Sequence, residues 1–212
     1  MKRILVFLAL CSLALAFPAF TLSAQTAEEI VARMDQELKR SDTEGLYLVM
    51  EMKIPIVGTV PSRVYSLGKK ARAEMEAKDK KTILWMDGTN TWTYDLNKNE
   101  IVITKKDQEK QSDTENNLQM LEGLTDGYKV HIQKETAEAW YLRCTKTADN
   151  KDKDAPKRMD LVVSKETHLP LLFTASVSIV TMTMKDITLG VTEEQVTFDP
   201  AKYPTATIID QR

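Results

Sequence analysis

The stretch Lys81–Thr104, which reads KTILWMDGTNTWTYDLNKNEIVIT, decides the fold. Two turn signals interrupt its apolar runs: the pair Asp87-Gly88 and the polar triplet Asn97–Asn99. Asp-Gly between apolar runs is a strong hairpin signal, because glycine tolerates the positive φ angles that tight turns need. The stretch therefore predicts three short strands in a meander, over residues 81–86, 90–95 and 100–104.

The middle strand of this meander alternates threonine with large aromatic residues, in the order Thr91, Trp92, Thr93 and Tyr94. Successive side chains of a strand point to opposite faces, so the two aromatics share one face of the sheet. The first strand is apolar on both faces, and its pattern leaves open whether Trp85 or its two neighbours face a ligand. The meander thus offers an apolar face without a catalytic group, and the question is what that face binds.

The chain begins with the features of a secretory signal peptide. Lys2 and Arg3 form a basic start, Ile4–Phe17 is an apolar-rich run, and small residues end at Ala24. The run is short for a membrane-spanning helix. We expect residues 1–24 to be cleaved and residues 25–212 to form a single domain. Cys11 follows a bulky leucine within the apolar run, which argues against lipidation, so the mature protein is expected to be soluble.

Charge and cysteine content restrict the classes of partner. The sequence has 29 basic and 31 acidic residues, and removal of Lys2 and Arg3 would leave 27 basic residues and a net charge of −4. This charge disfavours nucleic acids and anionic membrane surfaces as main partners. Cys144 would be the one remaining cysteine, so we expect no internal disulfide and a thiol buried within a strand. Export without disulfides fits a bacterial periplasm.

The remaining chain predicts a mainly β fold. Thr26–Arg40 is the clearest helix, with a capping box at its start and an apolar stripe made by Ile30, Met34 and Leu38. A second capping box, Ser112–Glu115, opens a short helix over about 113–122. With the meander we count about eleven strands and no βαβ alternation, which predicts one large, curled antiparallel sheet with helices laid against it. The other strands are expected at 45–54, 59–67, 69–78, 128–135, 139–147, 157–164, 169–178 and 179–189.

Alternation along these strands separates an apolar face from a polar one. Over residues 69–78, small apolar residues and Met75 oppose charged residues that include Arg72, which marks an antiparallel sheet wet on one side. Pro61 marks the strand 59–67 as an edge strand or a bulged one. Apolar faces of other strands are formed by Leu46, Leu48, Met50 and Met52, by Ile101 and Ile103, and by Trp140, Leu142 and Cys144.

Motifs for catalysis or metal binding are not found in the sequence. His131 lies on a predicted strand and His168 at the entrance of another, and no zinc-protease, nucleophile-elbow or phosphate-loop motif is present. Asp149, Asp152 and Asp154 miss the EF-hand spacing and alternate with lysines, as expected of a solvated loop. We therefore expect no enzyme activity, no metal and no cofactor.

Methionine content points instead towards an apolar ligand. The chain has ten methionines, one of them the initiator. Six of the others lie in predicted strands on faces that pack or bind, namely Met50, Met52, Met75, Met86, Met182 and Met184. Flexible thioethers suit surfaces that accept irregular apolar partners. Ordinary core packing is the alternative explanation, and composition alone favours it.

Three features of the chain resemble the LolA-type outer-membrane lipoprotein carriers and their wider superfamily. The first is the order of signal peptide, helix, and long run of strands broken by a short helix. The second is Ile83–Leu96, ILWMDGTNTWTYDL, with its Asp-Gly turn, tryptophan, tyrosine and polar turn. The third is the ending Val196–Arg212, which includes Phe198-Asp199-Pro200.

The resemblance implies an unclosed β-barrel in which helices act as a lid over a hydrophobic concave face. The family shelters the acyl chains of lipoproteins in that cavity while they cross the periplasm. It receives them from an inner-membrane ATP-driven (ABC) release complex and passes them to an outer-membrane receptor. By this resemblance we expect a monomeric carrier whose partners are acylated lipoproteins or related lipids.

The resemblance also assigns residues. Trp92 and Tyr94 carry over as cavity or cavity-rim residues, and Leu118 and Leu121 as lid residues, with Leu124 following them. Arg72 is the nearest candidate for the family's lid-tethering arginine, although the proline and aromatics that accompany that arginine are missing here. Together with the apolar strand faces, the expected cavity lining is Leu48, Met50, Met52, Met75, Trp85, Trp92, Tyr94, Ile101, Ile103, Trp140 and Leu142.

Other functions remain open at this level. A sensor domain of the same fold, which reads mislocalised lipids or lipoproteins in envelope stress, would form a stable complex with a membrane-bound regulator. A receptor-type relative would need an acylated N-terminal cysteine, which the context of Cys11 disfavours. An enzyme would need a convergent polar cluster deep in the cavity.

Overall fold

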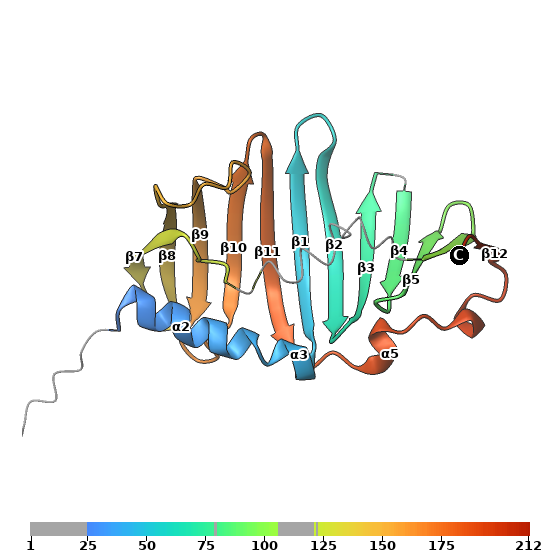
Figure 1. The fold of residues 1–212 in the computed structure, drawn as a ribbon, viewed down its shortest axis with the longest axis horizontal. Helices are drawn as coiled ribbons and strands as arrows, with labels where there is room; N and C mark the ends of the chain where they lie inside the picture. The colour runs from blue at the N-terminus through green and yellow to red at the C-terminus, as the bar shows by residue number, and fades with distance from the viewer. Residues whose placement is uncertain (1–24, 79, 106–120, 122) are drawn as a thin grey trace, which may run out of the picture.

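The computed structural model describes residues 25–78, 80–105, 121 and 123–212 (Figure 1). The expected signal peptide, most of the second predicted helix and its residue Leu118 lie outside this range. The described helices are α2 (Ala27–Leu38), α3 (Ser41–Glu44), α5 (Glu193–Val196) and the 3₁₀ turn η1 (Pro200–Lys202). The strands are β1 (Leu46–Ile54), β2 (Gly58–Leu67), β3 (Lys70–Ala77), β4 (Lys80–Met86), β5 (Asn90–Asp95), β6 (Glu100–Lys105), β7 (Tyr128–Glu135), β8 (Ala139–Lys146), β9 (Arg158–Ser164), β10 (Pro170–Val177), β11 (Val180–Leu189) and β12 (Thr207–Asp210).

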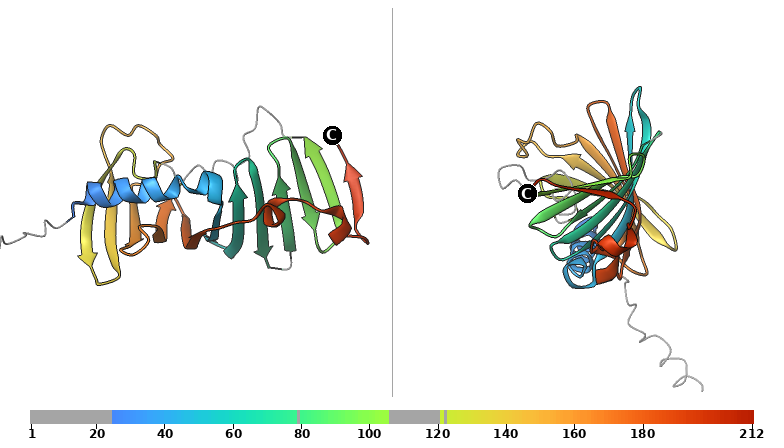
Figure 2. Two further views of the ribbon diagram at one scale, coloured as in Figure 1. Left: turned by 90° about the horizontal axis from the view of Figure 1, so that it is seen from below. Right: turned by 90° about the vertical axis from the view of Figure 1, so that its right-hand side faces the viewer.

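All twelve described strands join one sheet, in the order β12-β6-β5-β4-β3-β2-β1-β11-β10-β9-β8-β7. Every neighbouring pair is antiparallel except β12 with β6, which is parallel. The sheet is strongly twisted, and β7 and β12 form its two ends, so it is an unclosed barrel (Figure 2). The predicted mainly β fold is confirmed.

The predicted meander forms β4, β5 and β6. Gly88 has the positive φ of 85° that the turn requires. The carboxylate of Asp87 closes this turn, because its Oδ1 accepts hydrogen bonds from the backbone N–H groups of Thr89 and Asn90 at 2.8 and 2.7 Å. Local turn chemistry therefore sets the register of the first hairpin.

The strand β1 occupies the middle of the sheet, between β2 and β11, although it is the first strand of the chain. Its pairing with β11 places Met50 beside Met184 and Met52 beside Met182. Directly paired residues point to the same face, so register carries one apolar row across several strands. This non-local pairing joins the early and late parts of the chain.

Register divides the side chains between two faces of the sheet. We call the α2 face the one that carries Leu48, Met50, Leu84 and Leu142, against which α2 packs. We call the tail face the opposite one, which carries the cross-strand row Tyr47, Tyr65, Arg72, Trp85, Trp92 and Ile103.

The helix α2 lies across the β7–β11 end of the sheet (Figures 1 and 2). Its capping box forms as predicted, with Thr26 and Glu29 bonding each other's backbone N–H. Ile30, Met34 and Leu38 are completely or almost completely buried, at 0, 0 and 2% exposure. A twelve-residue helix has little stability alone, so this apolar stripe holds it on the sheet.

The C-terminal segment, residues 190–206, runs from the end of β11 across the β1–β6 end of the sheet (Figure 2). Val191 anchors its start against Gly45, where an added Cβ would lie 2.7 Å from both Val191 Cβ and the Ser66 carbonyl. The segment ends as β12, which pairs with β6. This short parallel strand accounts for twelve described strands where about eleven were expected.

Pro61 behaves as a local edge residue although β2 is a central strand. It pairs with Glu51 of β1, whereas the pairing of β2 with β3 begins only at Ser62. The prediction of an edge or bulged strand is corrected: β2 lies between β1 and β3 with a continuous register, and only Pro61 and the residues before it have no partner in β3.

Candidate functional site

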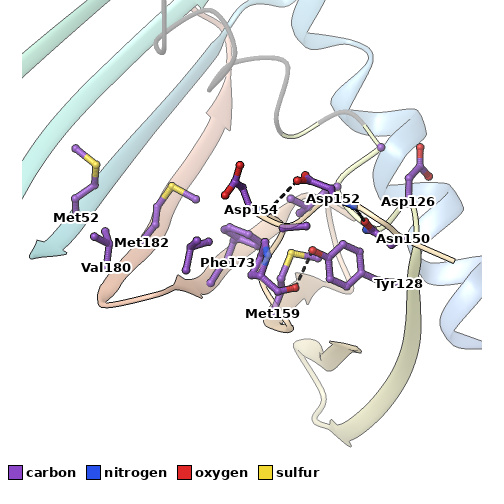
Figure 3. A pocket seen from close by; sticks show the side chains of 16 residues that line it. Met52, Asp126, Tyr128, Asn150, Asp152, Asp154, Met159, Phe173, Val180 and Met182 are labelled. Atoms are coloured by element: carbon purple, nitrogen blue, oxygen red, sulfur yellow. Dashed lines mark hydrogen bonds between the residues drawn. The ribbon is translucent and has the colours of Figure 1, made fainter. Parts of the chain in front are cut away.

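The α2 face contains a cavity of about 530 Å³ between the sheet and two loops (Figure 3). It lies beyond the buried core beneath α2, towards the hairpin that joins β10 to β11. The cavity is lined by Met52, Gly123, Leu124, Asp126, Tyr128, Asn150, Asp152, Asp154, Ala155, Pro156, Met159, Phe173, Ala175, Val177, Val180 and Met182.

The floor of the cavity is one register row across four strands. Met52 on β1 pairs with Met182 on β11, which pairs with Ala175 on β10, which pairs with Met159 on β9. Phe173 adds an aromatic ring from the neighbouring row and is 2% exposed. Thioethers are flexible and polarisable, so this floor can adapt its shape to an apolar ligand.

Apart from Tyr128, the polar side chains of the cavity come from two loops, residues 123–127 and 149–156 (Figure 3). Asp126, Asn150, Asp152 and Asp154 contribute the side chains, and the backbone N–H of Asp154 donates to Asp152 Oδ1 at 2.9 Å. Gly127 permits the two loops to approach, because a Cβ there would lie 2.8 Å from Asn150 Nδ2. The cavity is therefore apolar on the strands and polar at the loops.

Tyr128 links the loops to the sheet at the start of β7. Its hydroxyl donates to the Pro156 carbonyl at 2.9 Å. Burial raises the pKa of this phenol above its usual value, and the nearby Asp152 and Cys144 raise it further. The hydroxyl is therefore neutral and serves as a hydrogen-bond donor.

Cys144 is buried in β8, as predicted, with 1% exposure. Burial and then Asp160 raise the pKa of its thiol to about 11. A thiol with this pKa is a poor nucleophile and acts as a small apolar side chain. In the part of the chain that the structure describes, no group of three or more His, Cys, Asp or Glu side chains is placed to hold a metal ion.

The structure places the predicted α2-face residues at different depths. Leu48, Met50 and Leu142 belong to the buried core with α2 and Leu121. Met52 lines the cavity together with Leu124. Met75 is half-buried on β3, outside this lining. Trp140 is buried, with its ring 5.7 Å from His168.

The other five predicted lining residues lie on the tail face: Trp85, Trp92, Tyr94, Ile101 and Ile103. They cannot share a cavity with Met50 and Met52, because the register turns them to the opposite side of the sheet. The C-terminal segment covers them: Phe198 packs on Trp85 and Trp92, with both pairs of ring centroids 5.4 Å apart. The expectation of one common cavity is corrected accordingly, and the orientation left open for Trp85 is settled.

Arg72 also lies on the tail face. Its guanidinium sits 5.6 Å from the Tyr65 ring centroid and 5.7 Å from that of Trp85, and it pairs with Glu74 at 2.5 Å. Leu121 and Leu124 pack on the other side of the sheet. The expected tether between Arg72 and these residues is therefore corrected: the arginine anchors aromatic rings instead.

Several cavity residues were missed by sequence reasoning, namely Met159, Phe173, Ala175, Val177, Val180 and Met182. Each sits on an apolar face that alternation detects, and Met182 is one of the methionines in predicted strands. Their joint role depends on β9, β10 and β11 lying beside β1. No local signal shows this order.

Comparison with known proteins gives matches among solved structures only. No family model and no curated protein matches the chain. An uncharacterized conserved protein from Thermus thermophilus aligns at 17% identity and a TM-score of 0.48, covering 88% of this chain and 100% of its own.

Two further solved structures are similar to this chain. The Mycobacterium tuberculosis lipoprotein LppX aligns at 10% identity and a TM-score of 0.48, over 74% of this chain and 93% of its own. The LolA superfamily protein NE2245 from Nitrosomonas europaea aligns at 12% identity and a TM-score of 0.34, over 84% of this chain and 100% of its own.

None of the helices in the described part of the chain has the length and apolar character needed to cross a membrane.

Proposed function

We propose that this protein binds the acyl chains of lipoproteins or related lipids in the cavity of the α2 face and carries them through the periplasm. One observation supports the proposal most: the row Met52, Met182, Ala175 and Met159 forms a continuous apolar floor under a cavity of about 530 Å³. Ligand pockets generally measure about 300–1,000 Å³. The volume therefore suits one lipid tail or a small number of tails.

The energetics fit a carrier. Burial of an acyl chain is favourable by about 0.8 kcal/mol for each CH₂ group, so an aqueous carrier needs an extended apolar lining. The side chains that β1, β9, β10 and β11 contribute to the cavity are all apolar and have no titratable group. We therefore assign the binding of acyl chains to the strand side of this cavity.

The route of the cargo from the inner to the outer membrane comes from the resemblance and is part of the proposal. Cargo would come from an inner-membrane ABC release complex and go to an outer-membrane receptor. Neither partner is needed for the cavity to bind acyl chains, so the two parts can be tested separately.

The direct test is native mass spectrometry of the protein purified from a periplasm, with acyl species sought as bound adducts. Binding of a soluble fluorescent fatty acid then tests the cavity. Met182→Asp places a carboxylate on the floor and should reduce affinity at least about tenfold, because a desolvated charge opposes an apolar ligand.

The matched control is Thr183→Asp, which adds the same charge to the next residue of β11, on the tail face. It should bind the probe like the original protein. Equal affinity of both variants and the original protein, or a purified protein that neither carries nor binds acyl species, would refute the proposal.

A further inference from the structure

Two neighbouring hairpins present apolar tips at the same end of the sheet (Figure 1). Residues 55–57 turn between β1 and β2, and residues 178–179 turn between β10 and β11. The last residue pair between β1 and β11 is Lys53 with Thr181. Each of the two turns begins within two residues of this pair. The tips are therefore adjacent and project to similar heights.

The tips are unusually apolar and exposed for turns. Ile56 and Ile179 are 104 and 70% exposed, and Val57 and Val177 are 43 and 41% exposed. Turns normally favour glycine, proline, asparagine, aspartate and serine. The β5–β6 turn of the same sheet follows that rule with Asn97-Lys98-Asn99. Turn formation alone does not explain isoleucine at both tips.

The backbone conformation at Ile56 is a second sign that turn formation alone does not explain this residue. Its φ is +73°, a left-handed conformation in which a β-branched residue is a clear outlier. The residue accepts this strain and yet places its whole side chain in solvent. Strain of this kind is retained where a site needs it.

The apolar tips continue directly into the cavity. Val177 and Val180 pair at the base of the β10–β11 turn and also line the cavity. Met52 and Met182 follow in the next row. An apolar track thus runs from the tips to the cavity floor.

We propose that the two hairpin tips, Ile56–Val57 and Val177–Ile179, insert into the interfacial region of a phospholipid bilayer and place the cavity at the membrane surface. Interfacial insertion needs a few exposed apolar side chains beside groups that contact phosphates. Exposed Lys53, Lys78 and Lys80 lie at the same end of the sheet and supply such cations. The loop 149–156 adds side chains of both charge signs, with Lys151 and Lys153 beside Asp152 and Asp154.

This inference extends the proposed function to the place of cargo exchange. The test is cosedimentation of the purified protein with phosphatidylethanolamine–phosphatidylglycerol vesicles. The double variant Ile56→Asn/Ile179→Asn should lower the partition coefficient at least about tenfold, because each buried isoleucine contributes strongly to insertion. The control Leu171→Asn changes another exposed apolar residue, 46% exposed, at the opposite end of β10 and should partition like the original protein.

A second readout separates docking from folding. Asparagine tolerates positive φ better than isoleucine, so Ile56→Asn should raise Tm while it weakens vesicle binding. If the double variant loses its native circular dichroism, Ile179→Asn alone decides the question. The proposal would be overturned if the tip variants had the same partition coefficient as the original protein, or if the original protein did not bind vesicles.

The competing occupants give different results. If the tips join two copies of the chain, the double variant will change the sedimentation coefficient in the absence of vesicles, and the bilayer proposal fails. Binding of the fluorescent fatty acid is measured on the same samples. Vesicle binding that depends on the tips, without acyl binding, would refute the carrier function but not the docking surface. Acyl binding without tip-dependent vesicle binding would refute the docking surface alone.

Discussion

The indole of Trp92 stacks on the phenyl ring of Phe198, with centroids 5.4 Å apart and ring planes inclined by 21°. The first residue lies on β5 and the second on the C-terminal segment. Tyr203 extends the cluster, with its centroid 5.0 Å from Tyr94 and 6.0 Å from Phe198. The aromatic face that the sequence offers to a ligand is thus occupied by the chain itself. Trp92 and Tyr94 therefore act as packing residues for the C-terminal segment.

Removal of the Phe198 ring should destabilise the protein. Phe198→Ala loses a half-buried ring and three aromatic contacts, with Trp85, Trp92 and Tyr203, so the free energy of unfolding should fall by about 2 kcal/mol. Urea unfolding followed by tryptophan fluorescence measures this. Lys202→Ala, an exposed change in the same segment, should stay within about 0.5 kcal/mol. Fatty-acid affinity of the folded Phe198→Ala protein should be unchanged, and a large loss would place the ligand on the tail face.

Filling the cavity floor should weaken ligand binding. Ala175 is 4% exposed and lies between Met159 and Met182, so Ala175→Leu takes volume from the cavity. We expect a several-fold loss of fatty-acid affinity and a stability cost of about 1–3 kcal/mol. Fluorescence titration and urea unfolding measure the two effects.

Ala77→Leu provides the comparison, because Ala77 is on β3 and outside the cavity. Its affinity should match that of the original protein. An Ala175→Leu protein that binds as tightly as Ala77→Leu would show that the ligand does not use this floor.

The close packing of the two loops at the cavity should depend on glycine at position 127. Gly127→Ala combines a φ of +76° with a Cβ only 2.8 Å from Asn150 Nδ2, so it should cost about 2 kcal/mol or more. Gly68→Ala also has a positive φ, +55°, but meets open space, and should cost about 1 kcal/mol. The difference between the two variants in free energy of unfolding, measured by chemical denaturation, gives the steric contribution of Asn150. Equal costs would contradict a close contact between the loops.

Cys144 should make stability fall at alkaline pH. Its folded pKa of about 11 exceeds the ordinary value of 9.0, so the native state disfavours the thiolate. The stabilising contribution is complete below pH 9, decreases as pH rises above 9, and is lost as pH passes through about 11. Cys144→Val should flatten the pH dependence of Tm in this window.

Thiol reactivity offers a separate check on the same residue. In the native protein Cys144 should react slowly with a disulfide reagent at neutral pH, and urea should accelerate the reaction strongly. Fast native reaction would contradict the burial of the thiol.

Local patterns in the sequence determined much of this fold. The Asp87-Gly88 turn, the capping box at Thr26 and the stripe Ile30, Met34 and Leu38 all act between residues close in the chain. Such signals depend on φ preferences, hydrogen bonds and side-chain period, and each element formed where these placed it. Alternation also assigned Arg72 to the charged face and Cys144 to a buried one.

Only the tertiary structure decided what each face does. Period-two alternation separates the side chains of a strand into two sets, but it does not say which set of one strand continues that of another. The pairing of Met52 with Met182, and of Ala175 with Met159, depends on strand order, which hydrophobic packing between distant segments selects. The same holds for Phe198, whose path across the sheet turned Trp92 from an expected ligand contact into a packing residue.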